Sequence, residues 1–308
     1  MNEPAIDLQA VYKSFGPTEV LRGATLQVAR GKTFAFLGRN AAGKTTLIRM
    51  LLGLLNRDDG AIRVLGLDPQ RNSLELRRRV GYLAEEQTMY GWMRVDEIVR
   101  FVAPFYPTWD HDLALRYLRD FELPLRTRIK HLSKGQNVRL GLVLALAHRP
   151  ELVILDDPAL GLDPIMRKQF NRDLITHLQG EGHTVFYSSH LLYEVEPVAD
   201  EVAILHEGRI VRQADTETLR REIKQIILGR EALAVRRKSL SILDERTDGD
   251  RLAVVVEDAE RAMQLLGREG AEHRVVDLNL DEVFEAYVAG HRESERHAAS
   301  ALELQPLV

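Results

Sequence analysis

The sequence contains no cysteine, so disulfides and thiolate metal sites are excluded. That absence suits a reducing compartment such as the cytosol. No uninterrupted apolar run approaches the roughly 20 residues that a membrane-spanning helix needs. The first residues, MNEPAIDLQA, lack the basic and then apolar pattern of a secretory signal. We therefore expect a chain that does not cross a bilayer, and any work at a membrane requires docking onto another protein.

The chain also lacks a large excess of charge of either sign. Lysine plus arginine number 42 and aspartate plus glutamate 46, which gives a net charge of −4. This balance does not indicate a nucleic-acid footprint, so we predict no nucleic-acid partner. A length of 308 residues is enough for one large domain with a smaller companion.

The strongest pattern present is a glycine loop between a predicted strand at 33–37 and an apolar, predicted helical run at 47–55. It has the form GxxxxGKT, in which backbone N–H groups and the helix dipole hold phosphate. Lys44 would reach the β and γ phosphates, and the Thr45 hydroxyl would bind Mg²⁺. The alternative is a chance match in a glycine-bearing turn. The predicted nucleotide-binding residues of this loop are Gly38, Asn40, Ala41, Ala42, Gly43, Lys44, Thr45 and Thr46.

A second buried strand is predicted in the stretch LVILDDP at 152–158, and it ends in two acids. In nucleotide enzymes with such a loop, the first acid holds Mg²⁺ and the second handles the attacking water. These roles fall to Asp156 and Asp157, and the alternative is a turn with acids as ordinary turn residues. His190 follows a further strand at 184–188. A histidine in such a place is more often structural, but its position at a strand end makes it a candidate catalytic residue.

An antiparallel β layer is predicted before the loop, from strands at 6–11 and 21–29 around the turn at Phe15. Phe15 is either a surface that stacks on adenine or a core aromatic. Residues 94–131 are predicted to be helical, and the loop before them carries Met89, Tyr90, Trp92 and Met93, which form either core or a partner-facing patch. Ser133 opens a further helix at 137–148, whose start is a second possible anion-binding end.

Taken in order, these motifs resemble the ATPase subunit of ABC transporters over about residues 5–222. GRNAAGKTT resembles the phosphate loop of this family, LSKGQ its signature, LVILDDP its Mg²⁺ strand and ALGLD the loop that follows. Ser189-His190 resembles its switch histidine, and Phe15 stands where the family has an adenine-stacking aromatic. The segments GYLAEE at 81–86 and LNLDEVF at 278–284 resemble the branch whose membrane partner is a separate export-type permease.

The resemblance implies an α/β fold, a P-loop NTPase of the ABC nucleotide-binding type with an antiparallel β layer, a helical subdomain and a small C-terminal α+β domain. The implied boundaries are 1–222 for the ATPase domain, with its helical insertion at about 88–148, then 223–292 for the small domain and 293–308 for a tail. The implied cofactors are ATP and Mg²⁺.

The resemblance further implies a head-to-tail pair of ATPase subunits, either a homodimer or a heterodimer. In that pair the nucleotide on Lys44 of one copy is covered by the signature of the other. Signature and neighbouring residues that would contact nucleotide are Ser133, Gly135, Gln136 and Asp163, while Glu85 would reach metal and water. ATP-driven closure and hydrolysis-driven reopening would move a transmembrane permease, which places the chain at the cytoplasmic face of the cell membrane.

Several positions depart from the family pattern. Ala41 and Lys134 stand where glycine is usual, Glu85 where glutamine is usual, Asp157 where glutamate is usual and Leu160 where serine is usual. The shorter side chain of Asp157 withdraws its carboxylate by roughly 1.5 Å, and a misplacement of about 1 Å can cost on the order of a hundredfold in rate. An alternative function is therefore a slowly hydrolysing nucleotide switch that dimerises on ATP and regulates its membrane partner.

The C-terminal part shows no residue set that indicates chemistry. The pattern predicts a charged helix or linker at 216–228, strands at 232–235, 240–243, 251–256 and 273–278, and helices at 259–266 and 281–289. Asn279 and Glu282 predict a capping box for the last helix. The module either regulates or dimerises, or it is only a packing appendage.

Overall fold

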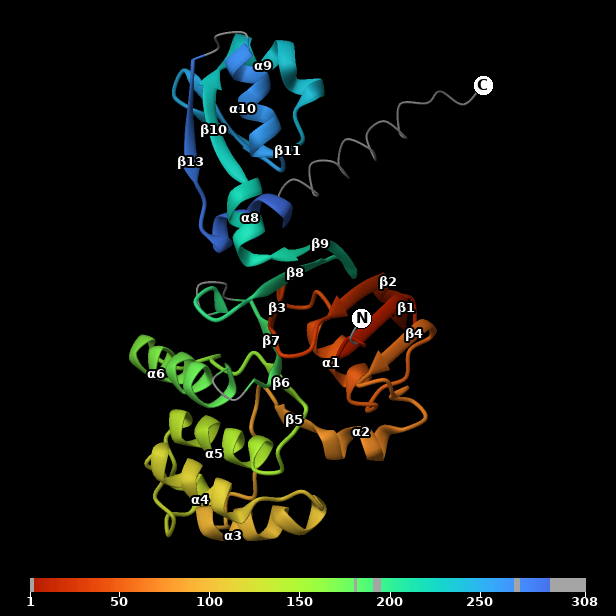
Figure 1. Cartoon of the computed structure of the whole chain (residues 1–308), viewed down its shortest axis with the longest axis vertical. Coiled ribbons are helices and arrows are strands. Elements are labelled where there is room, and N and C mark those ends of the chain that lie inside the picture. The colour runs from red at the N-terminus through yellow and green to blue at the C-terminus, as the bar shows by residue number, and fades with distance from the viewer. Residues whose placement is uncertain (1–2, 180–181, 191–194, 269–271, 289–308) are drawn as a thin grey trace. The chain divides into compact units, whose positions relative to one another are not determined.

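A computed structural model describes residues 3–179, 182–190, 195–268 and 272–288 of the chain (Figure 1). The chain divides into two compact units, Met1–Gln213 and Ala214–Val308. The expected ATPase domain ran to residue 222, but helix α8 (Thr216–Glu222) is grouped with the second unit, where it contacts helix α10 (Ala259–Arg268). The predicted tail at 293–308 lies outside the described residues.

The first unit is built on a sheet with the strand order β5-β6-β7-β3-β8-β9. Strand β3 pairs in parallel with both β7 and β8, and β6 pairs in parallel with β5 and β7. All residues of β3, β6 and β7 are buried, as expected for a parallel sheet covered on both faces. The strands span Val80–Leu83 (β5), Leu152–Asp156 (β6), Thr184–Ser189 (β7), Thr33–Gly38 (β3), Glu201–His206 (β8) and Arg209–Asp215 (β9).

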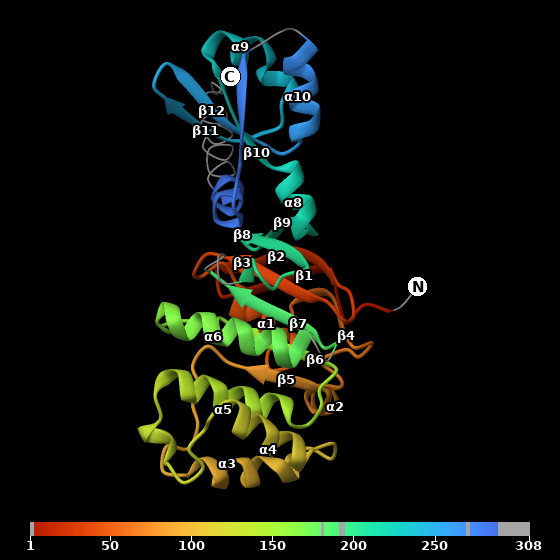
Figure 2. The ribbon, with the colours of Figure 1, turned by 60° about the vertical axis from the view of Figure 1, so that its left-hand side comes forward.

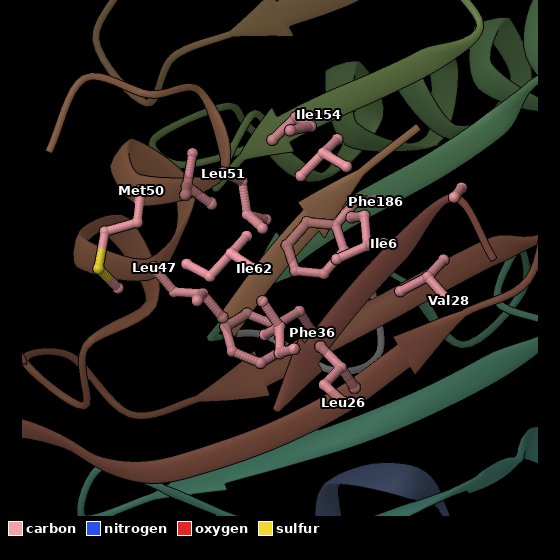
Figure 3. Close-up of a cluster of buried hydrophobic side chains, with 14 of the residues drawn as sticks. Ile6, Leu26, Val28, Phe36, Leu47, Met50, Leu51, Ile62, Ile154 and Phe186 are labelled. Carbon is pink, nitrogen blue, oxygen red and sulfur yellow. The ribbon is translucent and has the colours of Figure 1, made fainter. Parts of the chain in front are cut away.

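A second, antiparallel sheet has the order β2-β1-β4, with strands Thr18–Val28 (β2), Ile6–Phe15 (β1) and Asp59–Val64 (β4). This confirms the antiparallel layer predicted from the sequence. Helix α1 (Lys44–Leu51) contacts β3, β4 and β6. Side chains from these elements form one buried cluster, in which Leu47 and Leu51 of α1 lie among residues of both sheets such as Ile62 and Phe36 (Figure 3). The cluster fixes α1 at the end of β3.

Helices fill the stretch between β5 and β6, as predicted. Helix α2 (Ser73–Arg79) precedes β5, and α3 (Val95–Val102), α4 (His111–Asp120) and α5 (Lys134–Leu146) follow it, with short 3-10 turns at Ala103–Phe105 and Ile129–His131. Helix α5 contacts both α3 and α4, and Figure 2 shows the three side by side. Asp110 caps α4, because its carboxylate accepts a hydrogen bond from Leu113 N at 2.8 Å.

The ALGLD loop leads into α6 (Pro164–Leu174), which continues as a π-helix over Ile175–Gln179. It begins where Asp163 Oδ1 accepts hydrogen bonds from the backbone N–H groups of Ile165 and Met166, both at 2.9 Å. Proline at the first helical position suits this start, because that N–H would have no partner within the helix. In the part of the chain that the structure describes, no helix is both long and apolar enough to cross a membrane.

The second unit carries a four-stranded antiparallel sheet in the order β11-β12-β10-β13. Its elements are β10 (Lys224–Gly229), α9 (Arg230–Arg236), a 3-10 turn (Arg237–Ser239), β11 (Ile242–Asp248), β12 (Arg251–Val256), α10 and β13 (His273–Asp277). Each helix connects two strands that are not consecutive neighbours in the sheet, which is the split βαβ arrangement. A further helix covers residues 280–288, and its predicted capping box is confirmed by Asn279 N to Glu282 Oε2 at 2.8 Å and Glu282 N to Asn279 Oδ1 at 2.9 Å.

Two element predictions for this unit were wrong. Residues 224–229 form a strand rather than a helix or linker, because Ile226 and Leu228 alternate into the unit's core. Residues 230–236 form a helix rather than a strand, because only one apolar stripe is buried there. Leu233 is 1% exposed, whereas Val235 is 78% exposed.

Candidate functional site

The glycine loop joins the buried end of β3 to the first turn of α1. Gly43 stands before the helix with φ 109°, in the left-handed region that favours glycine. A Cβ atom there would lie 3.1 Å from side-chain atoms of Val20 and Leu21, so both the conformation and the close packing require glycine. Among the residues that the structure describes, no side chain caps the helix, so its first N–H groups remain available to an anion. Ala41 also lies in the left-handed region, at φ 65°.

Lys44, the first residue of α1, is 6% exposed. Its Nζ donates a hydrogen bond to the Gly38 carbonyl at 2.9 Å and lies 3.4 Å from Asp157 Oδ2. The ammonium group is therefore held over the loop by a carbonyl and a carboxylate. An anionic ligand that enters the loop would replace the carboxylate as its partner.

Asp156 ends β6 and lies beside Ser188 of the neighbouring strand β7. Ser188 Oγ donates a hydrogen bond to Asp156 Oδ1 at 2.8 Å. Burial raises the pKa of Asp156, while hydrogen bonds from Ser188 and the Thr45 side chain oppose this shift. A carboxylate and a hydroxyl side by side are hard oxygen ligands of the kind Mg²⁺ takes together with phosphate oxygens, so the residues present fit this ion.

Asp157 connects the lysine to the histidine predicted as the switch. Its Oδ1 accepts hydrogen bonds from the backbone N–H of His190 at 3.1 Å and lies 2.7 Å from His190 Nδ1. This contact makes Nδ1 the protonated nitrogen in the neutral ring and leaves Nε2 as the acceptor. Asp157 has φ 43°, and its backbone N–H donates to the Ser188 carbonyl at 3.1 Å. Asp157 therefore contacts both Lys44, at the start of α1, and His190, after the end of β7.

These groups border a cleft of about 470 Å³. Phe15 stands at its rim, 51% exposed, with Lys13 Nζ 5.3 Å from the ring centroid, so the alternative that Phe15 is a core residue is wrong. Val20 also lines the cleft, and its place in an ordinary strand pattern gave no signal of this. The lining residues are Phe15, Val20, Asn40, Ala41, Gly43, Lys44, Thr45, Thr46, Glu85, Asp157, Leu160 and His190.

The signature residues do not line this cleft. Ser133 is exposed at the start of α5, where its Oγ accepts a hydrogen bond from Gln136 N at 3.2 Å and its N–H donates to Gln136 Oε1 at 2.9 Å. Gly135 is buried, because the Met166 side chain covers it, and a Cβ there would collide with Met166 Cε. Asp163 caps α6. Within one chain the structure therefore does not bring these residues to the glycine loop.

The loop before α3 contains the apolar cluster for which two interpretations were open. Met93 is 9% exposed, so core packing is correct for this residue. Tyr90 and Trp92 are 52% and 66% exposed, and their ring centroids lie 6.0 Å apart. Tyr90 also stacks edge-on against Phe101 at 5.6 Å. The partner-facing role of these exposed rings stays a prediction.

Comparisons with known proteins agree with this geometry. A family model described as ABC transporter matches residues 21–160. The chain is 31% identical over 260 residues to the bacitracin transport ATP-binding protein BcrA of Bacillus licheniformis, covering 84% of each chain. It is 30% identical over 220 residues to the lantibiotic transport ATP-binding protein SrtF of Streptococcus pyogenes, covering 68% of this chain and 90% of the relative.

The fold has solved counterparts. A structure titled as the ATP binding subunit of an ABC transporter superposes with a TM-score of 0.64 and 29% identity, covering 70% of this chain and 92% of that chain. The loop, the strand-end acids and the helical insertion occupy one compact unit here, and the residues that match the family model, 21–160, lie within that unit. The chain belongs to the ABC transporter family, as one of its ATP-binding subunits.

Proposed function

We propose that this protein binds and hydrolyses ATP with Mg²⁺ and thereby drives a separate export permease from the cytoplasmic face of the cell membrane. The observation that carries the proposal is the convergence of Lys44, Asp157 and His190 at the start of α1, with Asp157 2.7 Å from the histidine and 3.4 Å from the lysine. Two relatives named for bacitracin and lantibiotic transport support the export assignment.

Binding of ATP would exchange one partner of Lys44 for another. The loop N–H groups and the helix dipole attract the triphosphate, and the Lys44 ammonium turns from Asp157 to the β and γ phosphates. Phe15, which is exposed at the rim of the cleft, offers its face to the adenine. Mg²⁺, when bound, would neutralise charge on the phosphates, and Thr45, Asp156 and Glu85 would hold it.

Hydrolysis would then use the carboxylate that Lys44 has released. Asp157 would orient the attacking water and accept its proton, and His190 would hold the Asp157 carboxylate through Nδ1–H, which leaves Nε2 to accept a hydrogen bond from the attacking water. Asp157 fixes the Nδ1 tautomer of His190, so the ring and the carboxylate act as a unit. Positioning and charge stabilisation would supply most of the rate.

A second copy would complete the site. Ser133, Gly135, Gln136 and Asp163 lie away from the cleft of their own chain, which supports a role at the nucleotide of a partner subunit. Closure of the pair would exclude water, and hydrolysis would reopen it. The permease would receive this motion through the helical insertion at about 88–148 and the loop at Glu85.

One observation favours the alternative of a slowly hydrolysing switch. The short side chain of Asp157 is engaged with His190 through Oδ1, and its backbone lies at φ 43°, where a non-glycine residue is rarely found. A carboxylate held back in this way would position water poorly. ATP would then close the pair for long periods and regulate the membrane partner instead of cycling it rapidly.

Equilibrium binding of a fluorescent ATP analogue and phosphate release, each with and without permease-containing membranes, would test these assignments. Lys44→Ala should abolish binding, whereas Lys32→Ala removes the same charge from an exposed position and should leave it unchanged. Turnover that is stimulated by the permease supports the transport motor. Tight binding with background turnover in both conditions supports the switch, and unchanged binding in Lys44→Ala contradicts the site assignment itself.

A further inference from the structure

Phe15, which is proposed to stack on adenine, is the last residue of β1 and is 51% exposed at the rim of the cleft. A ring at such a strand end is free to turn unless a neighbour holds it, and ordering it then costs part of the binding energy. Lys13 is that neighbour. The two side chains lie two residues apart on one face of the strand, and Lys13 Nζ lies 5.3 Å from the Phe15 ring centroid. Lys13 has no part in the proposed handling of phosphate, metal or water.

Lys13 is held in this place by Asp58, in the turn before β4. The Lys13 side chain is only 11% exposed, and its Nζ donates a hydrogen bond to Asp58 Oδ1 at 2.6 Å. The Ser14 backbone N–H donates to the other oxygen, Oδ2, at 2.7 Å, and Asp58 N donates to the Tyr12 carbonyl at 3.0 Å. Hydrogen bonds from Lys13 and Ser14 hold the pKa of Asp58 below its usual value, so the carboxylate stays charged. One residue therefore fixes three consecutive residues of β1.

The turn that carries Asp58 is itself fastened at its base. The Arg57 guanidinium donates to both carboxylate oxygens of Asp68, at 3.2 and 2.9 Å, and its Nε donates to the Gly60 carbonyl at 2.9 Å. Gly60 has φ 85°, and a Cβ atom there would collide with the Ala10 carbonyl of β1. Turn and strand therefore pack backbone against backbone, which leaves Asp58 little freedom to move.

A bulge directs the neighbouring strand β2 towards the nucleotide cleft. The register between β1 and β2 shifts at Lys13 and Ser14, and Val20 is the extra residue of β2. Bulges re-aim side chains next to active sites, and Val20 lines the cleft together with Phe15. Lys13 is not among the described residues that line it, so its ammonium contacts the ring from outside the cleft and leaves the other face for a flat base. Because an aromatic ring is negative on its faces, a cation behind Phe15 also reduces the repulsion between the ring and the π electrons of the base.

We propose that Lys13 and Asp58 are positioning residues for nucleotide binding, which hold Phe15 in the orientation that stacks on the base. This role rests on the proposed stacking of Phe15 on adenine, and it adds the pair that lies behind the ring. Because the ring is fixed before ATP arrives, less conformational entropy is lost on binding. The pair should therefore contribute to recognition of the base, and binding of the triphosphate by the glycine loop should not depend on it.

Calorimetric titration of the full-length chain with ATP and with inorganic tripolyphosphate, each with Mg²⁺, separates these two contributions. Tripolyphosphate carries the phosphates and no base. Phe15→Ala should weaken ATP binding about tenfold and leave tripolyphosphate binding unchanged. Lys13→Met keeps the apolar stem but loses the ammonium, and it should weaken ATP binding about fivefold, again with tripolyphosphate binding unchanged. Lys32→Met, at an exposed position, is the matched control and should change neither.

Three further variants test whether Lys13 acts through the ring. Lys13→Met added to Phe15→Ala should cause no further loss of ATP affinity, because no ring remains to be held. Lys13→Arg should retain most of the ATP affinity, since a guanidinium can bind Asp58 and lie against an aromatic face. Asp58→Ala removes the anchor and should weaken ATP binding in the same way as Lys13→Met.

The outcomes separate this role from the proposed function. ATP binding that is weakened in Phe15→Ala and unchanged in Lys13→Met overturns the positioning role alone. Equal weakening of ATP and tripolyphosphate binding in Lys13→Met, or the same loss of ATP affinity when Phe15 is absent, shows that Lys13 acts through charge or folding and also overturns it. Unchanged ATP binding in Phe15→Ala contradicts the adenine stacking itself, and the positioning role is overturned with it.

Discussion

Replacing Asp157 with asparagine removes one negative charge from the cleft and leaves its shape nearly unchanged. The asparagine carbonyl can still accept the backbone N–H of His190, which lies 3.1 Å from Oδ1 in the wild type. The substitution therefore separates two roles of this side chain. One role is its electrostatic competition with ATP for Lys44, and the other is the handling of water.

The competition can be estimated from the structure. Asp157 Oδ2 lies 3.4 Å from Lys44 Nζ, and the two side chains are 9% and 6% exposed. Unit charges about 4 Å apart interact by about 4 kcal/mol at an effective dielectric constant near 20. The cleft is open to water and Lys44 keeps its bond to Gly38, so we take about a third of this value. About 1.4 kcal/mol corresponds to roughly tenfold tighter ATP binding in Asp157→Asn.

Turnover should change in the opposite direction. A positioned base contributes about 10²–10⁴-fold to a rate, so hydrolysis by Asp157→Asn should fall by about a hundredfold or more. Titration with a fluorescent ATP analogue and single-turnover phosphate release measure the two effects separately. Asp59→Asn, which removes the same charge from an exposed strand end, is the control and should change neither. Weaker ATP binding would refute the competition between Asp157 and ATP for Lys44. Unchanged hydrolysis would refute the role of Asp157 in handling water.

Three further substitutions test other parts of the structure. Ala41→Gly relieves a left-handed backbone at φ 65° and should raise the free energy of unfolding by roughly 0.5 kcal/mol in urea titrations; a decrease contradicts the strain. Gly135→Ala forces Met166 aside and should lower ATPase activity with ATP binding kept. If Gly135 contacts a partner's nucleotide, the double variant with Met166→Ala stays impaired, whereas full rescue shows that only packing is involved. Burial lowers the pKa of His148 to about 4, below its value near 6.5 in the unfolded chain. Between these two pH values the unfolded state binds more protons than the folded state, so the free energy of unfolding falls as the pH drops from about 6.5 to about 4. His148→Phe keeps the stacking on Tyr106 and should reduce this loss of stability at low pH, measured by thermal melts, by up to about 3 kcal/mol. An unchanged pH dependence of stability would show that other groups cause the loss.

Local signals made most of the first unit predictable. The apolar run at 33–37 and the glycines of the loop specify a strand, a turn and a helix start without reference to the rest of the chain, and β3 and α1 follow that pattern. The same holds for the capping box at Asn279, which needs only residues three apart. Short apolar runs without such signals were ambiguous. Residues 224–228 and 232–235 were assigned the wrong element because their periodicity becomes clear only when the buried face is known.

Other features depend on strand neighbours that the sequence does not reveal. Val20 lines the cleft because β2 runs beside the glycine loop, and nothing in its local pattern indicates this. The signature serine lies away from the cleft of its own chain for the same kind of reason. Its helix, α5, belongs to the helical layer between β5 and β6. The order of the strands in the sheet decides where that layer lies, and the spacing of motifs along the chain does not.

By itself, the sequence determined which groups are available: a loop for phosphate, a lysine, two strand-end acids, a histidine, and no thiol. Only the tertiary structure decided that Lys44, Asp157 and His190 meet, with the carboxylate between the two basic groups. The physical reason is the strand order, because β6, β7 and β3 are neighbours in one parallel sheet and their carboxyl ends open at the same edge. Residues distant in sequence become partners there, and that contact cannot be read from either segment alone.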